Sequence, residues 1–353
     1  MGSTEMTADT VPAEPGSDTP APVTPDEERP ADRRKLLILL LMLLIFLLLV
    51  MVAAWYLLFH KPLTEVMPGV TTPETMPAYQ GSLYNLSRPQ DVTVSKDGTR
   101  LVITQTGDTY DTVMFDRLGN KLGVLAPPSD QVPSPHQLFV ATDPLTGEYW
   151  ATDRFNGLIA IYTAAGKFDK IFDPGAANAN WQPLAIAFDK SGDAYVADVS
   201  NGAAVIDVFG PDGKPLRSFG SGQNLDHPNG IVVADDGTTY VTDTGNGQLK
   251  IFDGSGNLVG SVDRGAAEGN LGLPVGIGID DHGNVLVVDS SAARVQAYHQ
   301  LASGQHSPDY VNAFGANGSG DAQFSFPNGL AVDGQGRVYI ADWGNDRLEI
   351  WGY

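Results

Sequence analysis

The chain has 353 residues, no cysteine, and 42 acidic against 21 basic residues, which gives a formal net charge of −21 at pH 7. So acidic a chain is a poor candidate for nucleic-acid binding, which depends on clustered Lys and Arg. Without cysteine it can form no disulfide, thiolate nucleophile or cysteine-ligated metal site. Its 40 glycines and 24 prolines indicate many turns and favour short strands.

The N-terminal segments predict a tail, a membrane anchor and a linker. Residues 1–35 are acidic, Pro-rich and without apolar periodicity, so we expect a disordered tail. Residues 36–59 carry no charge, and a helix of that length rises about 36 Å, enough to cross a bilayer. A cleaved signal peptide is the alternative, but its apolar core is shorter. Residues 60–77, rich in Pro and Thr, are expected to be a semi-rigid linker.

The charges flanking the apolar segment predict its orientation. Four basic residues precede it: Arg29, Arg33, Arg34 and Lys35. Only Lys61 follows it closely. The positive-inside rule therefore predicts a single-pass protein of the cell membrane with a cytoplasmic N-terminus and everything after His60 extracytoplasmic.

From residue 78 onwards the chain is repetitive. Each unit has a proline, an alternating apolar run, an Asp/Gly turn, a second apolar run and an Asp. The six marker prolines are Pro89, Pro135, Pro183, Pro228, Pro274 and Pro327. A period of about 46 residues with period-2 alternation and Asp-Gly turns, such as Asp236-Gly237, predicts four short strands per unit, which is a β-propeller blade.

Residues 78–353 thus predict an all-β, six-bladed propeller. The last unit stops after its third strand, whereas 78–85 has strand-like alternation and no unit of its own. We expect 78–85 to complete the last blade, so that the ring closes without an unpaired edge.

Two units resemble the repeat of the NHL family. They are FPNGLAVDGQGRVYIADWGNDRLEIW (326–351) and HPNGIVVADDGTTYVTDTGNGQLKIF (227–252), although Gln248 replaces the family's Arg. The first unit departs most, with Gln105 in the Asp position. The resemblance implies the propeller fold; it implies little about function, because propellers host many unrelated activities.

Two sets of loop residues are expected on one face of the propeller, around the mouth of its channel. Residues after the marker prolines form an inner ring, and residues after the repeat Asp form a wider one. From these rings we predict a ligand-binding face comprising Gln90, His136, Asn229, Asn328, Arg154, Phe155 and Trp343. Arg and aromatic side chains are the residues that dominate binding interfaces.

One Asp recurs in five of the units: Asp153, Asp198, Asp243, Asp289 and Asp342. A carboxylate at one fixed place per blade favours a structural role, accepting hydrogen bonds from backbone N–H groups of a tight connection. Calcium binding by one or two of them is the alternative.

His136 raises the possibility of zinc. The stretch 134–153 is similar to the Pro-His repeats of amidating lyases, propellers that hold a catalytic zinc with His from several blades. Here only one marker proline is followed by His, and a catalytic zinc needs about three protein ligands. His227 precedes its proline and is expected to point elsewhere. We therefore predict no metal or other cofactor, with zinc and calcium as the alternatives.

These observations favour a binding protein over an enzyme. No serine-nucleophile, metalloprotease or phosphate-loop motif occurs in the sequence. We expect a membrane-anchored, extracytoplasmic binding, sensing or scaffold module that binds a protein or cell-envelope ligand and no nucleic acid. A metal-dependent hydrolase or lyase acting at the channel mouth is the alternative.

Overall fold

The computed structural model describes residues 30–59, 76–174, 180–200, 202 and 204–353. The chain divides into two units, Met1–Pro73 and Glu74–Tyr353. Of the tail predicted for 1–35, residues 1–29 lie outside the described residues, and so do residues 60–75 of the linker predicted for 60–77; residues 30–35 are helical, not disordered.

A single helix, α1 (Pro30–Phe59), forms from the apolar segment. It begins before residue 36, because a proline is compatible with the first turn of a helix, where its missing N–H is not needed. Side chains of this helix are described only at residues 35 and 37–52. Within the described residues, no helix is both long enough and apolar enough to span a membrane.

Blades one to three are four-stranded antiparallel sheets formed by consecutive strands. The first blade contains β2 (Pro89–Val94), β3 (Arg100–Gln105), β4 (Thr112–Asp116) and β5 (Lys121–Leu125). The second contains β6 (Phe139–Thr142), β7 (Tyr149–Asp153), β8 (Leu158–Tyr162) and β9 (Phe168–Phe172). The third contains β10 (Pro183–Phe188), β11 (Ala194–Asp198), β12 (Val205–Phe209) and β13 (Pro215–Phe219).

Blades four and five repeat this order. The fourth contains β14 (Pro228–Val233), β15 (Thr239–Asp243), β16 (Gln248–Phe252) and β17 (Leu258–Val262). The fifth contains β18 (Pro274–Ile279), β19 (Val285–Asp289), β20 (Arg294–Tyr298) and β21 (Tyr310–Phe314). A short parallel pair, β22 (Ala316–Asn317) and β23 (Gln323–Phe324), leads into the sixth.

The sixth blade joins the two ends of the repeat region. Its sheet contains β24 (Pro327–Val332), β25 (Val338–Asp342), β26 (Arg347–Gly352) and, at its outer edge, β1 (Ala78–Leu83). A 3-10 turn, η2 (Trp343–Asn345), connects β25 to β26. Because β1 pairs antiparallel with β26, from Ala78 opposite Gly352 to Leu83 opposite Leu348, the outer edge of the last blade is paired.

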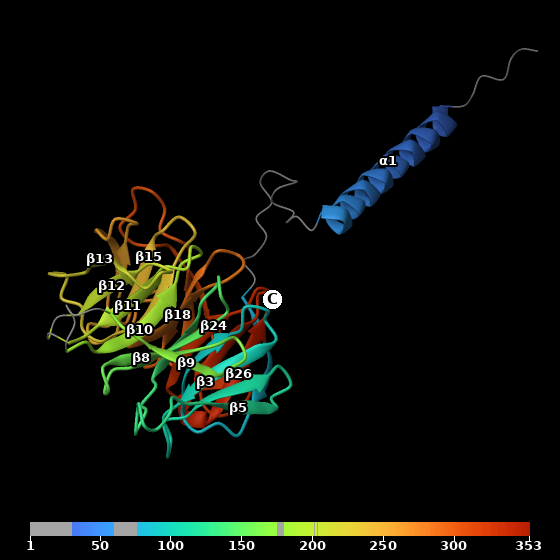
Figure 1. The fold of residues 1–353 in the computed structure, drawn as a ribbon. Coiled ribbons are helices and arrows are strands. Elements are labelled where there is room, and N and C mark those ends of the chain that lie inside the picture. Colours follow the sequence, from blue (N-terminus) through green and yellow to red (C-terminus); the bar gives the residue numbers. More distant parts are fainter. Residues whose placement is uncertain (1–29, 60–75, 175–179, 201, 203) are drawn as a thin grey trace, which may run out of the picture. The chain divides into compact units, whose positions relative to one another are not determined.

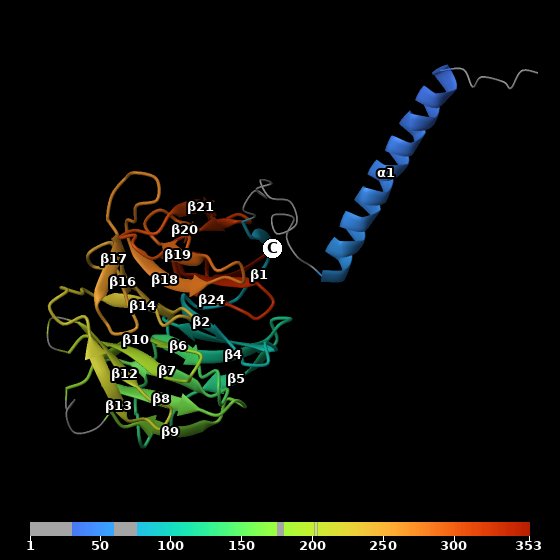
Figure 2. The same cartoon turned by 90° about the horizontal axis from the view of Figure 1, so that it is seen from above.

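The six innermost strands surround a central axis, as Figures 1 and 2 show. Each of them (β2, β6, β10, β14, β18 and β24) contacts the innermost strands of both neighbouring blades, so the ring is closed. The prediction of an all-β, six-bladed propeller is confirmed.

Aromatic side chains fill the space between blades. Phe172 of the second blade packs edge-on against Phe209 of the third, with ring centroids 5.1 Å apart, and Phe219 lies 5.0 Å from Phe252 of the fourth. Burial of each such ring stabilises the fold by about 1.5–3 kcal/mol. The blades are therefore held by their flat faces, which leaves the connecting loops free to vary.

Candidate functional site

Two adjoining cavities lie along the propeller axis. The channel, about 410 Å³, is lined by the innermost strands, including Ile186, Ile231 and Leu330. The second cavity, about 600 Å³, lies among the loops that enter the innermost strands, and we call it the mouth. Phe139 and Asn229 line both, so the mouth adjoins the channel.

The structure brings six of the seven predicted face residues to the mouth. They are Gln90, Asn229, Asn328, Arg154, Phe155 and Trp343. The seventh, His136, lies beside it, where its ring is 4.7 Å from that of Tyr110 and 5.4 Å from that of Phe155, centroid to centroid. The predicted residues thus form one surface, built from loops and from the first residues of innermost strands in blades one, two, four and six.

His136 itself does not occupy the inner-ring position expected for it. In the second blade Leu138 occupies this position, as the hydrogen bonds between neighbouring blades show. Thr104 donates to the carbonyl of Leu138 at 2.7 Å, just as Thr152 donates to that of the inner-ring Leu184. Pro135 therefore stands earlier in its loop than the other marker prolines do, and repeat spacing alone misplaced this histidine.

Three mouth residues that the sequence analysis did not select come directly before marker prolines. Arg88, His227 and Phe326 all have a left-handed backbone, with φ of 49°, 49° and 50°. All three line the mouth, so the expectation that His227 points elsewhere was wrong. Non-glycine residues adopt this conformation at some cost, and here it recurs directly before the innermost strands of blades one, four and six.

Two guanidinium groups lie over aromatic rings of the mouth. Arg88 lies 5.0 Å above the ring of Trp343, whose Nε1–H donates to Thr106 Oγ1 at 3.0 Å. Arg154 lies 4.9 Å above the ring of Phe155. Such cation–π contacts hold a guanidinium in place while leaving its N–H donors available.

The recurring Asp carboxylates are buried and accept bonds from the loop that precedes the innermost strand of the same blade. Asp153 accepts from the backbone N–H of His136 at 2.7 Å, and Asp342 from that of Ser325 at 2.7 Å. The remaining members, Asp198, Asp243 and Asp289, accept equivalent bonds from Gln182, Asp226 and Gly272. We call this hydrogen bond, from a loop N–H to the recurring Asp, the clamp. It holds the loops that form the mouth.

Two blades add a buried cation to this clamp. Lys250 Nζ lies 2.7 Å from Asp243, and Arg347 Nε lies 2.9 Å from Asp342. Lys250 thus supplies the positive charge that Gln248 lacks. In the first blade Gln105 replaces the Asp but accepts from the Ser87 N–H at 2.6 Å, so the loop keeps its anchor.

Burial and hydrogen bonding shift the clamp pKa values in opposite directions. For Asp289, burial opposes ionisation, but the N–H groups of Leu273 and Gly272 outweigh it and lower the pKa. For Asp342, burial prevails over the same kinds of bond and raises the pKa.

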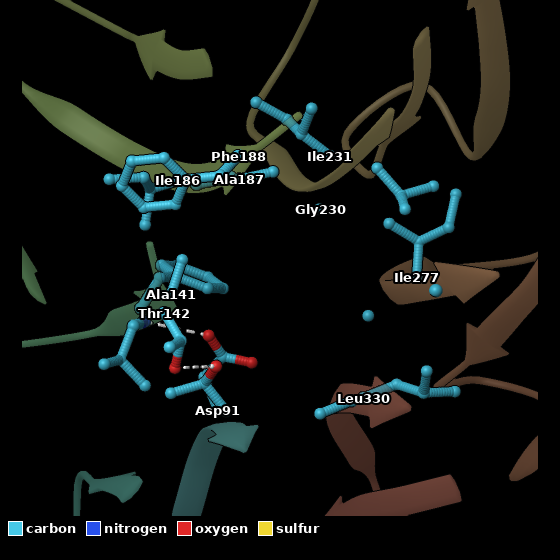
Figure 3. Close-up of a pocket in the computed structure, with 18 of the residues that line it drawn as sticks. Asp91, Ala141, Thr142, Ile186, Ala187, Phe188, Gly230, Ile231, Ile277 and Leu330 are labelled. Atoms are coloured by element: carbon cyan, nitrogen blue, oxygen red, sulfur yellow. Dashed lines mark hydrogen bonds between the residues drawn. The ribbon is translucent and has the colours of Figure 1, made fainter. Parts of the chain in front are cut away.

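Two carboxylates line the channel, Asp91 and Asp189, and Asp91 faces its apolar walls. Figure 3 shows Asp91 facing Ile277 and Leu330 across the cavity. Burial raises the pKa of Asp91 to about 7, against the opposing effect of the backbone N–H groups of Val140 and Val92. Near neutral pH this group is therefore present in both its acid and its ionised form.

The mouth brings together no set of metal ligands among the described residues. The one grouping of three potential ligands in the described part of the chain is Asp280, Asp281 and His282, in the hairpin between β18 and β19. Asp280 is already engaged by the N–H groups of His282 and Asn284 and by the Tyr353 hydroxyl.

Comparison with known proteins agrees with the repeat pattern. A model of the NHL repeat matches residues 225–252, which contain β14–β16, and residues 324–351, which contain β24, β25 and all but the last residue of β26. This chain contains NHL repeats. The mouse and human proteins named NHL repeat-containing protein 3 are 29% and 27% identical to it over 172 residues, 44% of this chain and 48% of each relative. The chain therefore spans about half the length of the curated relatives it matches.

Solved structures share the architecture of this NHL-repeat chain. A streptogramin B lyase is 15% identical with a TM-score of 0.56, covering 78% of this chain and 98% of the lyase. Virginiamycin B lyase from Staphylococcus aureus is 16% identical with a TM-score of 0.54, covering 79% and 99%. At such identity the likeness shows the fold alone.

Proposed function

We propose that this NHL-repeat protein is an extracytoplasmic binding module, anchored in the membrane by residues 36–59, that holds its ligand or protein partner in the mouth. The observation that carries the proposal is the mouth itself, a cavity of about 600 Å³ into which three blades project exposed aromatic and Arg side chains. Concave surfaces of this size that combine aromatic side chains with converging polar groups are typical binding sites.

Exposed phenylalanines distinguish this surface from the rest of the described propeller. Among the described residues of the propeller, Phe155 and Phe326 are the two exposed phenylalanines, at 60% and 62%, and both line the mouth. Keeping such rings in water is unfavourable unless a partner covers them. A sensing or scaffold role would use the same surface.

The anchoring rests on the sequence. Residues 36–59 carry no charge, and the basic residues on their N-terminal side outnumber those that follow closely. In this arrangement the propeller is extracytoplasmic, and its acidic surface would be repelled by anionic lipid head groups.

Substituting two aromatic residues of the mouth tests the binding function. We expect the full-length Phe155→Ala/Trp343→Ala variant to lose the proteins that crosslink to the wild type in its native membrane, because truncation removes much of the apolar contact. Quantitative mass spectrometry of the crosslinked material measures this. A Leu118→Ala/Leu216→Ala variant, altered at exposed leucines outside the mouth, is the matched control. An unchanged crosslinking pattern in a correctly melting mouth variant would refute the assignment.

Metal analysis distinguishes this function from the hydrolase or lyase alternative. We expect elemental analysis of the full-length chain, purified without chelator, to show zinc and calcium well below one ion per chain, because His136 belongs to no group of three potential ligands among the described residues. Stoichiometric zinc that disappears in a His136→Ala variant would instead favour the metal-dependent enzyme.

A further inference from the structure

The mouth has the opposite charge balance to the chain as a whole. The chain carries a formal charge of −21, yet the residues lining the mouth include two arginines and no Asp or Glu. An acidic protein gains nothing in solubility from a local excess of positive charge. Where low-dielectric walls enclose such a patch, its field concentrates oppositely charged ligands.

Neither mouth arginine has a counter-ion in the described part of the structure. Their guanidinium groups contact Trp343 and Phe155 only through the ring faces. Arg154 Nε is also buried without a hydrogen-bond partner among the described residues. Some cations outside the mouth do have carboxylate partners, as Arg337 has Asp333 at 2.8 Å and Lys190 has Asp235 at 3.6 Å. A buried N–H without a partner is unfavourable, and a ligand oxygen that accepts from it would remove this cost.

Carboxylates close to the mouth are engaged by other groups. Asp226 lies 2.6 Å from His227 Nδ1, and Asp346 accepts the backbone N–H of Arg88 at 2.8 Å. Both hold loop residues, and neither forms an ion pair with Arg88 or Arg154 in the described part of the chain. The Arg donors point to an anion, since guanidinium groups match carboxylate and phosphate oxygens.

We infer that the mouth binds a small organic anion, a carboxylate or phosphate ester, that carries an aromatic ring. Arg88 and Arg154 bind the anionic group, and the ring packs against the exposed Phe155 and Phe326. The side-chain amides of the inner ring, such as Asn229, offer further donors. This inference rests on the proposed function, because it assigns a ligand class to the same cavity.

Ligand titration of the full-length chain tests the inference. The probes are 2-naphthoate, 2-naphthyl phosphate, the uncharged 2-naphthylmethanol and inorganic phosphate, with binding measured by calorimetry and by the fluorescence of Trp343 and the other tryptophans. We expect one or both aryl anions to bind at least tenfold more tightly than the alcohol and than phosphate alone. The two aryl anions differ in head group and so distinguish a carboxylate site from a phosphate site.

Variants identify the groups responsible. An Arg88→Gln/Arg154→Gln variant should bind the preferred aryl anion at least tenfold more weakly and with less salt dependence, while its melting temperature stays close to the wild type. Arg217→Gln is the matched control, because Arg217 also lies over a ring, 5.6 Å from that of Tyr195, but outside the mouth. It should bind like the wild type.

Failure of this inference differs from failure of the proposed function. Equal binding of the alcohol and the anions, binding of neither anion, or unchanged binding by the Arg88→Gln/Arg154→Gln variant would each overturn the anion assignment. The proposed function would still stand if crosslinking depends on Phe155 and Trp343. It fails together with the inference only if that dependence is absent as well.

Discussion

Deletion of residues 76–86 from the full-length chain should lower the melting temperature of the propeller by about 10 °C or more. The deletion removes β1, which pairs with β26 along the outer edge of the last blade. It also removes the buried Leu83 and Leu86, which pack in one cluster with Leu348. Loss of about 5 kcal/mol is expected from two buried leucines and a strand of hydrogen bonds, and each kcal/mol shifts the melting temperature by about 2–4 °C in a domain of this size.

Differential scanning calorimetry measures this effect, and a deletion of equal length provides the control. Removal of residues 62–72, within the predicted linker, should leave the melting temperature within about 2 °C of the wild type. A synthetic peptide of residues 76–88 should restore part of the lost stability of the 76–86 variant, because the exposed edge of β26 would then be paired again. If the 76–86 deletion melts like the wild type, closure by β1 does not stabilise the ring.

Sequence periodicity predicted the blades well because every blade packs between its two neighbours in the same way. Apolar alternation and a turn with a left-handed Gly, such as Gly98 or Gly336, recur in all six repeats, and the second strand of each blade is buried between neighbouring sheets. The position of Asp342 or Asp153 at the end of a second strand follows from the same repetition.

The mouth was only partly predictable because its residues depart from the repeat. His136 was assigned to a ring position on the assumption that each proline marks the same point, whereas the second blade places Leu138 there. Arg88 and Phe326 reach the mouth through a left-handed residue before proline, a conformation that this sequence position disfavours. An aromatic residue or an Arg directly before a marker proline is the sequence feature from which these two mouth residues could have been predicted.

Replacement of Asp91 by asparagine should change how the stability of the propeller depends on pH. Burial raises the pKa of Asp91 to about 7, well above the value of about 3.9 expected in the unfolded chain. Between these values the folded state holds a proton that the unfolded state has released. The free energy of unfolding of the wild type must therefore fall as pH rises from about 4 to 7 and level off above that.

The asparagine variant lacks this titration. Its amide can still accept the Val140 N–H that bonds to Asp91 Oδ2 at 3.0 Å, and it carries no charge to be buried. At pH 8 we expect Asp91→Asn to be more stable than the wild type by about 2–4 kcal/mol, with little difference at pH 5. Chemical denaturation at pH 5, 6.5 and 8 measures the two curves.

Two other carboxylates with shifted pKa values bear on the comparison of the wild-type and Asp91→Asn stability curves. Burial also raises the pKa of Glu349 to about 7, so it adds a slope of the same sign to both proteins, and the difference between the curves isolates Asp91. The pKa of Asp97 is shifted in the opposite direction, because hydrogen bonds from Ser95 and Thr99 lower it to about 2. Asp97→Asn should therefore keep the wild-type slope between pH 5 and 8. Parallel curves for Asp91→Asn and the wild type would show that the channel carboxylate is ionised in the folded protein throughout this range.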